Sequence, residues 1–398
     1  MVRDDPPGIQ ALKGHAMTRR RLRVIPVLWI SAWALLAASV PAGATTLTWS
    51  VVPSPSPGSG YNVLSAVSCV SSAACTAVGL DREDTAPYAF HTLAEAWNGT
   101  RWSVVPSPTP GGVVAVNLNG VSCVSPAACM AVGYYETSSG GESALIESWN
   151  GTSWSVVPSP HPASSNVILH GVSCVSAAAC TAVGSFYHLH SGTIETFVES
   201  WNGATWSVVP SPGPASGGNV LSAVSCVSAA ACTAVGYDYE APTLEQTLVE
   251  SWNGATWSVV PSPNRPQSND LVGVSCVSAT ACMAVGSHGD HRTNRALIES
   301  WNGATWSLVT SPNPGSTYDE LYGVSCPSAA ACIAVGWYES PRVEKLLLES
   351  WNGTNWSVVH STSPGPGSNI LSAVSCVSAA ACTAAGSTGR KTLIESGS

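Results

Sequence analysis

The stretch from Asn219 to Pro263 contains the whole pattern that decides the fold. It begins with NVLSAVSC (Asn219–Cys226) and CTAVGY (Cys232–Tyr237), and it continues with TLVESW (Thr247–Trp252) and TWSVVPSP (Thr256–Pro263). Each segment is short, rich in β-branched or small residues, and bounded by Gly, Pro, Asn or Ser. Such segments predict four strands joined by tight turns.

The same pattern returns along the chain, and the cysteines mark it. All 14 cysteines fall into C-x5-C pairs. The pairs are Cys69 with Cys75, Cys123 with Cys129, Cys174 with Cys180, Cys226 with Cys232, Cys276 with Cys282, Cys326 with Cys332, and Cys376 with Cys382. Each pair flanks a five-residue loop between two adjacent strands, so the two thiols face each other within bridging distance. We expect seven disulfides rather than zinc sites, which need four ligands in compact clusters.

Repeats of about 50 residues with four strands each are the signature of a β-propeller. The sequence therefore predicts an all-β fold with seven four-stranded blades. Gly or Ala before Val-Ser-Cys suits an innermost strand crowded at the axis, and the proline-rich ending suits an outer edge strand. The expected blades are 62–108, 116–160, 167–212, 219–263, 269–312, 319–362, and 369–396 together with 46–55.

The last unit stops at TLIESGS (Thr392–Ser398), directly after its third strand. The segment TLTWSVVPSP (Thr46–Pro55) is a fourth strand without the three that should precede it. A closed ring can pair the two ends, whereas an open solenoid would leave both of them as unpaired edges. We therefore predict that the N-terminal strand closes the last blade.

The hairpin ESWNGATW (Glu250–Trp257) resembles the Asp-box of sialidase-type (BNR) propellers, S-x-D-x-G-x-T-W. Ser251, Asn253 and Gly254 follow the box, but Asn replaces Asp and one residue is missing before the glycine. The repeat length is similar to that of kelch propellers, and the chain resembles secreted, cysteine-paired bacterial repeat proteins. Because Asp-boxes are fold elements, the resemblance implies architecture rather than chemistry.

Residues 1–44 have the features of a signal peptide. A basic segment (Met17–Arg23) precedes an apolar stretch (Val24–Val40) and a small-residue cleavage site (Ala42–Ala44). Residues 1–16 would then be a mis-assigned start or an extension. We expect secretion, with an uncleaved membrane anchor at 24–40 as the alternative, and no membrane span in the mature chain.

Composition limits the partners. The chain is 45% hydrophobic and 10% charged, and residues 45–398 contain 22 acidic and 9 basic side chains. This acidic balance argues against nucleic acid or an anionic membrane as a partner. We expect a monomer without cofactor or metal, and an extracellular glycan, cell-wall polymer or protein as the partner.

Function should lie where the units differ. The segments VSAAA and WNGAT hardly change between units, whereas loops such as Leu80–His91 and Ser287–Arg295 do. Binding residues usually lie on such loops. Near the channel mouth, one strand position carries the polar candidates Asn62, Asn219, Asn269, Asp319 and Asn369. His170 and Tyr322 lie further along their strands; a water-filled channel lined by solvated side chains is the alternative to ligand binding.

Two further residue types recur once or twice per unit. The glutamates Glu95, Glu147, Glu199, Glu250, Glu299, Glu349 and Glu395 occur one per blade, which suggests hydrogen bonding between blades. Catalytic carboxylates instead come as one pair at one place. The paired tryptophans, such as Trp252 and Trp257, fit packing between blades, with a sugar-stacking platform as the alternative.

Chemistry-bearing clusters are sparse. His188, His190, His288 and His291 are the metal candidates, but they lie in two units that are not adjacent. A sialidase-like hydrolase would need arginines such as Arg292, Arg295 and Arg342 converging with a Glu or Tyr. No catalytic residue can be assigned, and no G-x-S-x-G, H-E-x-x-H or P-loop motif occurs. The sequence favours a secreted, non-enzymatic binding or scaffold module; a hydrolase and a purely structural surface protein are the alternatives.

Overall fold

The computed structural model describes residues 47–85, 88–138, 140–160, 165–214, 217–241, 244–290, 292–341, 343–361, 364–365 and 367–398. The predicted signal peptide lies outside these ranges. The described residues form strands, turns and loops, and none of them forms a helix that could cross a membrane.

The strands form seven antiparallel four-stranded sheets, as the repeats predict. Blade 1 contains β2 (Asn62–Ser71), β3 (Ala74–Arg82), β4 (Phe90–Trp97) and β5 (Trp102–Val104). Blade 2 contains β6 (Val113–Ser125), β7 (Ala128–Thr137), β8 (Glu142–Trp149) and β9 (Trp154–Val156). Blade 3 contains β10 (Ser165–Ser176), β11 (Ala179–His188), β12 (Ile194–Trp201) and β13 (Trp206–Val208). Blade 4 contains β14 (Asn219–Ser228), β15 (Ala231–Ala241), β16 (Leu244–Trp252) and β17 (Trp257–Val259).

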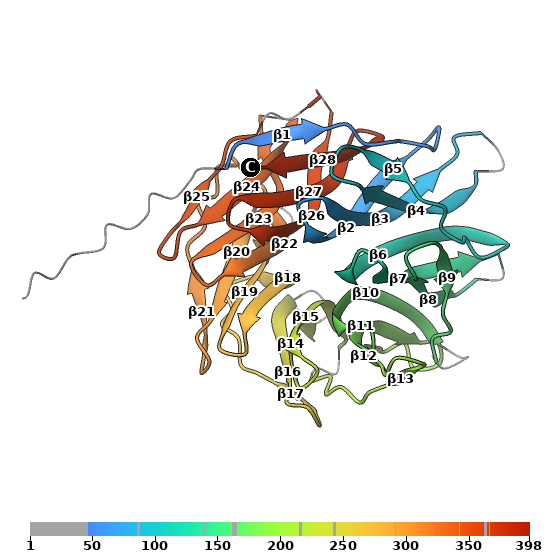
Figure 1. The fold of residues 1–398 in the computed structure, drawn as a ribbon. Helices are drawn as coiled ribbons and strands as arrows, with labels where there is room; N and C mark the ends of the chain where they lie inside the picture. The colour runs from blue at the N-terminus through green and yellow to red at the C-terminus, as the bar shows by residue number, and fades with distance from the viewer. Residues whose placement is uncertain are drawn as a thin grey trace, which may run out of the picture. The chain divides into compact units, whose positions relative to one another are not determined.

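The remaining blades follow the same order. Blade 5 contains β18 (Ser268–Ser278), β19 (Ala281–Gly289), β20 (Asn294–Trp301) and β21 (Trp306–Val309). Blade 6 contains β22 (Asp319–Ser328), β23 (Ala331–Ser340), β24 (Val343–Trp351) and β25 (Trp356–Val358). Blade 7 contains β26 (Asn369–Ser378), β27 (Ala381–Thr388), β28 (Lys391–Gly397) and β1 (Trp49–Val52). Figure 1 shows the first strand of each blade around the centre and the short fourth strand at the rim.

The N-terminal strand β1 closes blade 7, as predicted. It pairs antiparallel with β28, and Trp49 lies opposite Gly397. Backbone hydrogen bonds also join Thr48 and Ser398 in both directions. Trp49 supplies the buried tryptophan of this blade, and its ring fills the space that a side chain at position 397 would need. The two ends of the described chain therefore belong to one sheet.

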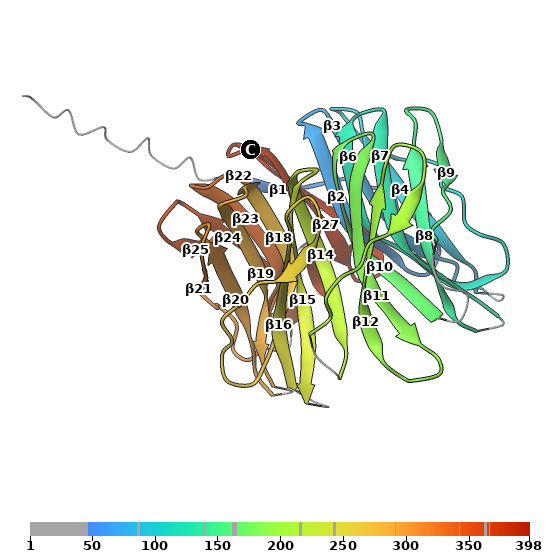
Figure 2. The same cartoon turned by 90° about the horizontal axis from the view of Figure 1, so that it is seen from below.

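Inner strands of adjacent blades approach each other closely at the axis. A Cβ atom added to Gly171 would lie 3.1 Å from the Cα of Ala223, and one on Gly323 would lie 3.0 Å from the Cα of Ala373. Larger side chains would push the blades apart, so this position carries Gly or Ala. Figure 2 shows β14 and β18, the inner strands of neighbouring blades, running side by side between the two ends of the ring.

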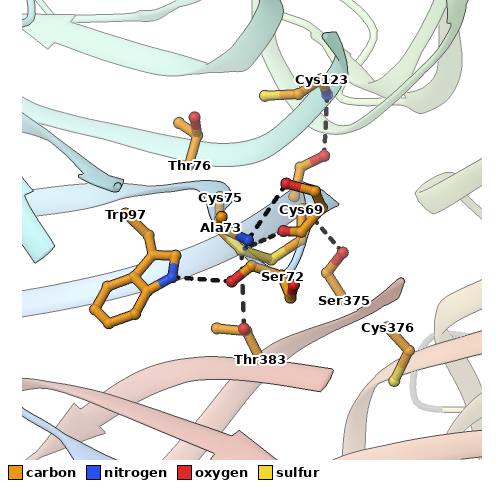
Figure 3. Close-up of a disulfide and its surroundings, with 12 residues drawn as sticks. Cys69, Ser72, Ala73, Cys75, Thr76, Trp97, Cys123, Ser375, Cys376 and Thr383 are labelled. Atoms are coloured by element: carbon orange, nitrogen blue, oxygen red, sulfur yellow. Dashed lines mark hydrogen bonds between the residues drawn. A yellow bond between two sulfur atoms is a disulfide. The ribbon is translucent and has the colours of Figure 1, made fainter. Parts of the chain in front are cut away.

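The serine of each Val-Ser-Cys motif links two blades. Its hydroxyl accepts a hydrogen bond of 2.9–3.0 Å from the N–H of the cysteine in the next blade. The series closes on itself, because Ser375 of blade 7 binds the N–H of Cys69 in blade 1 (Figure 3). This serine ring holds the inner strands together around the whole circle.

All seven predicted disulfides form, each between the first and second strands of one blade. The bonds are Cys69–Cys75, Cys123–Cys129, Cys174–Cys180, Cys226–Cys232, Cys276–Cys282, Cys326–Cys332 and Cys376–Cys382, and in each the Cα atoms lie 4.0 Å apart. Figure 3 shows the bond in blade 1 beside Trp97, whose indole N–H donates to the carbonyl of Ser72 in the same hairpin. None of the described cysteines is free.

The second cysteine of each pair belongs to the core and not to a surface site. These cysteines expose only 3–5% of their surface: Cys75, Cys129, Cys180, Cys232, Cys282, Cys332 and Cys382. Each packs into an apolar cluster with buried side chains of its own and a neighbouring blade. The structural role predicted for the cysteines is thus confirmed, because burial and the disulfide leave no thiol for a ligand.

The core consists of seven such apolar clusters rather than one central core. Side chains from two neighbouring blades build each cluster. Val198 of blade 3, for example, packs in the same cluster as Leu248 and Trp257 of blade 4. Each blade is therefore stabilised by burying apolar surface against its neighbours, which is why the ring needs all of its blades.

Candidate functional site

The two ends of the ring differ in how closely the blades repeat. At one end, the turn between strands three and four is the same in six blades. In blade 1 the side-chain oxygen of Asn98 accepts hydrogen bonds from the N–H groups of Thr100 and Arg101. The glycine of each turn has φ between 90° and 94°, a conformation that favours glycine. The hairpin expected at ESWNGATW is confirmed, and the side chains of this repeated end make contacts that hold the fold together.

Charged side chains gather at the opposite end. Within the described ranges, Arg101 is the only charged residue in a turn at the repeated end. The others are the seven buried glutamates or lie at the end formed by the loops between strands two and three and the connections between blades. We call this second end the variable face. It is the end that the sequence predicts to bind.

Two pockets open on the variable face. The blade 5 pocket has a volume of about 510 Å³, and its lining includes Glu245, Gln267, Asp270, Ser287, Asp290 and Asn294. The blade 6 pocket has a volume of about 450 Å³, and its lining includes Tyr318, Trp337, Glu339, Glu344 and Ser368. Both combine carboxylates with hydroxyl, amide or aromatic groups, which is the mixture that orients a ligand in a pocket.

An aromatic pair forms one wall of the blade 6 pocket. Tyr318, in the connection before β22, stacks on Trp337 of β23 with ring centroids 6.1 Å apart and an angle of 16° between the planes. The indole N–H of Trp337 donates to Glu320 Oε2 at 3.1 Å and to the Tyr322 hydroxyl at 2.9 Å. Tyr322 in turn donates to Glu320 at 2.7 Å. These contacts fix the orientation of the indole ring.

Glu320 connects the two pockets. Its Oε1 accepts a hydrogen bond from the amide of Asn294 at 2.9 Å. The same amide donates to Ser287 Oγ at 3.0 Å, and Ser287 donates to Asp270 Oδ1 at 2.6 Å. A continuous chain of side chains therefore runs from the blade 5 pocket to the aromatic wall of the blade 6 pocket.

Burial raises the pKa of two side chains in this hydrogen-bonded network. Loss of water contact is the main reason that the pKa of Asp270 is raised to about 6; the Ser287 hydrogen bond opposes this rise, and the charges of Glu245 and Glu320 contribute to it. Burial, followed by the charge of Glu320, also raises the pKa of Tyr322. Asp270 can thus gain a proton in mildly acidic solution, which would turn one acceptor in the pocket into a donor.

The predicted channel-mouth residues are buried. Asn62, Asn219, Asn269, Asp319 and Asn369 expose 0–2% of their surface. Asn62 exchanges two hydrogen bonds with the backbone of Gly58, and Asn269 does the same with Arg265. These side chains hold the connections that lead into the inner strands. Ligand binding by the five residues remains a prediction.

His170 and Tyr322 occupy equivalent positions in their blades. Each is the extra residue of a β-bulge that follows a buried leucine in the inner strand. All seven inner strands carry this bulge, and bulges re-aim the side chains around them. Burial lowers the pKa of His170 to about 4. Tyr322 belongs to the network described above, whereas His170 lies in blade 3.

The histidine and arginine candidates do not assemble into a described site. His291 and Arg342 lie outside the described residues. Within those residues, no group of three His, Cys, Asp or Glu side chains could hold a metal ion. Arg295 binds the buried carboxylate of Asp319 at 2.6 Å and the carbonyls of Gly315 and Ser316. Its guanidinium is thus engaged in holding a loop.

The paired tryptophans mainly pack the repeated end. In six blades the first indole donates to a carbonyl of the neighbouring turn at 3.0–3.1 Å. The second indole of each pair, and its counterpart Trp49, exposes only 4–7% of its surface. Three small grooves between blades, of about 90 to 240 Å³, are lined by these rings and by disulfide cysteines. These contacts support the packing interpretation.

Sequence reasoning missed two parts of the variable face. The stack of Tyr318 on Trp337 joins two segments that have no common motif. At the seam between blades 7 and 1, the Arg82 guanidinium lies 4.7 Å from the Tyr61 ring centroid, and Arg390 binds Asp84 at 2.9 Å. The only sequence signal for the aromatic stack and for the contacts at the seam is the high density of aromatic and charged residues in the variable loops.

Comparisons with known proteins identify the fold and no family. No protein-family model matches the sequence, and no curated protein matches it. Among solved structures, YCF48 bound to D1 peptide has a TM-score of 0.53 at 11% identity, over 87% of this chain and 96% of that chain. The xyloglucanase of glycoside hydrolase family GH74 from Xanthomonas campestris has a TM-score of 0.53 at 12% identity. The match covers 87% of this chain and 53% of the xyloglucanase. These likenesses support a β-propeller; the Asp-box resemblance remains a prediction.

Proposed function

We propose that the protein is a secreted, non-enzymatic propeller that binds an extracellular glycan or cell-wall polymer on its variable face. The connected pockets of blades 5 and 6 form the site. The observation that carries the proposal is the stacked Tyr318–Trp337 wall joined by hydrogen bonds to Glu320, Asn294 and Asp270. A flat aromatic surface packs against the apolar face of a sugar ring, while carboxylates and amides bind its hydroxyl groups.

The location of the site on blades 5 and 6 is specific. The equivalent of Trp337 is Tyr237 in blade 4 and Ser185 in blade 3, and neither stacks on a described loop residue in the way that Trp337 stacks on Tyr318. Seven disulfides also suit an oxidising compartment outside the cytosol. Secretion, cleavage of residues 1–44 and a monomeric state are part of the same proposal.

A binding screen with matched variants tests this function. The oxidised full chain is applied to an array of glycans, cell-wall polymers and peptides, and the measurement is repeated with Trp337→Ala. We expect binding to weaken by about tenfold or more, equivalent to ~1.4 kcal/mol, because the stacking surface is lost. Tyr187→Ala, an exposed aromatic of blade 3, is the control and should bind normally. A polymer bound equally well by all three proteins would contradict the proposed site.

A hydrolase is the second candidate, because one observation favours it. The Tyr322 hydroxyl donates to a carboxylate, Glu320, and a tyrosine with a carboxylate partner is what a sialidase-like mechanism requires. The required arginine cluster has no support among the described residues, since Arg295 is bound to Asp319. Release of reducing sugar from the bound polymer, lost in Tyr322→Phe, would favour the hydrolase over the binding module.

A further inference from the structure

Each blade buries one glutamate in its third strand, at an interface with the preceding blade. Glu95, Glu147, Glu199, Glu250, Glu299, Glu349 and Glu395 all have no exposed surface. No other acidic side chain recurs at the same position in every blade. The seven carboxyl groups thus form one set, which we call the glutamate ring.

Every member of the glutamate ring makes the same hydrogen bond. One carboxyl oxygen lies 2.6–2.7 Å from a serine hydroxyl in the proline-rich segment that leaves the preceding blade. These serines are Ser54, Ser107, Ser159, Ser211, Ser262, Ser311 and Ser361. The other carboxyl oxygen of each glutamate is buried and receives no hydrogen bond from a described residue.

No positive charge among the described residues compensates these carboxyls. Glu250 lies beside Ala234 of β15 and Val259 of β17, and the other six have Ala on the second strand and Val or Leu on the fourth. The titratable group that acts on the ring is Asp319, whose charge opposes ionisation of Glu349. An ionised carboxylate with one hydrogen bond and no cation is poorly stabilised away from water, whereas a neutral carboxyl group is not.

We propose that each blade interface takes up one proton on its buried glutamate when the ring forms. The folded ring is therefore more stable against unfolding in mildly acidic solution than above neutral pH. The proposal rests on the blade interfaces alone, so its failure would leave the proposed binding function untouched.

In blades whose third strand has a threonine beside the serine, the hydroxyl groups can accommodate both protonation states. In the segment that leaves blade 3, Ser211 lies 2.6 Å from Glu250 and 2.9 Å from the Thr196 hydroxyl. A protonated Glu250 can donate to Ser211, which then donates to Thr196; an ionised Glu250 instead requires the serine proton. Blades 2 and 5 have Ala144 and Ala296 where blade 3 has Thr196, so their serines lack this second partner.

Burial provides the driving force. It raises the pKa of Glu95, Glu147, Glu199, Glu250, Glu299 and Glu349 from the ordinary value of 4.5 to about 7, against a smaller opposing effect of the serine hydrogen bond. The pKa of Glu395 is raised for the same reasons. Between these two values the folded chain holds protons that the unfolded chain has released. The stabilising contribution is complete below about pH 4.5, falls as the pH rises, and is lost above about pH 7.

The test counts protons. Urea unfolding of the disulfide-bonded full chain, at several values between about pH 5 and pH 8, gives the number of protons taken up on folding from the slope of stability against pH. We expect Glu250→Gln to reduce that number by about one near pH 6, because glutamine cannot bind the proton. Glu240→Gln, which changes an exposed glutamate of the same blade, should leave the number unchanged.

A second readout covers a variant that folds poorly. In infrared spectra of the folded wild-type chain, the carbonyl stretch of protonated carboxyl groups should be present near pH 6 and decrease by about pH 8. Ser211→Ala removes the hydroxyl that favours ionised Glu250 and should move part of this loss to higher pH. A wild-type spectrum without that band near pH 6, or an unchanged proton number in a folded Glu250→Gln variant, would overturn the proposal.

Discussion

The repeated end and the variable face are built on the same strands, yet they use side chains differently. At the repeated end, Asn98 and its equivalents bind the N–H groups of their own turns, and the neighbouring indoles bind backbone carbonyls. On the variable face, Trp337, Glu320 and Asn294 connect side chains from different loops around two pockets. Side chains that recur from blade to blade thus hold the ring together, whereas side chains that differ between blades are the ones available for binding.

Closure of the ring should give the largest effect, because both ends depend on it. Deletion of residues 47–55 removes β1 and its buried Trp49 from blade 7. It also removes Ser54, the hydrogen-bond partner of Glu95 at the seam with blade 1. We expect the thermal midpoint to fall by more than about 10 °C, measured by circular dichroism. Adding the peptide TLTWSVVPSP should restore part of the loss. An unchanged midpoint would show that β1 does not close the ring.

Loss of one disulfide should have an intermediate effect confined to one blade. Replacement of Cys226 and Cys232 by serine removes a cross-link between residues six positions apart, for which the chain-entropy model gives a loss of roughly 2 kcal/mol. Urea unfolding of the double variant measures the difference. Removing the bond between Cys376 and Cys382 as well should double the loss in free energy of unfolding. The two effects should add because blades 4 and 7 are not adjacent. A loss well above the sum would mean that the blades unfold as one unit through these hairpins.

Changes at a loop tip of the variable face should have the smallest effect on stability. Leu189, between β11 and β12, is 56% exposed, so Leu189→Ser should change the free energy of unfolding by less than about 0.5 kcal/mol. The matched change at the repeated end is Trp201→Ser in the same blade, whose indole binds the carbonyl of Ala177. Urea unfolding should separate the two clearly. Equal losses would contradict the division of roles between the ends.

Much of the fold follows from the sequence because its causes are local and repeated. The C-x5-C hairpins, the small residue before Val-Ser-Cys and the unmatched N-terminal strand each have one physical interpretation, and the structure confirms them. The serine ring and the serine partners of the glutamates were not predictable in this way. Apart from the bond between Ser375 and Cys69, they join residues 34 to 55 positions apart in different blades, so their partners appear only when the blades are placed side by side.

The candidate site was predicted only as a face. Strand position alone suggested that Asn62 and its equivalents line a channel mouth, but the connections between blades fold over them and take their hydrogen bonds. Tyr322 was noted for its place in the strand, whereas its partners Glu320 and Trp337 were not. Such contacts depend on how two unrelated loops pack, and periodicity carries no information about that.

The central claim is that the variable face, and not the repeated end, binds the ligand. The most direct test measures how one polymer binds to variants altered at each end of the ring. Isothermal titration of the polymer identified in the screen should be carried out with the wild-type chain, Trp337→Ala and Arg101→Ala. We expect Trp337→Ala, on the variable face, to weaken binding by about tenfold or more, and Arg101→Ala, at the repeated end, to bind as the wild type does. Weaker binding in Arg101→Ala with normal binding in Trp337→Ala would place the ligand on the repeated end and contradict the assignment of the variable face.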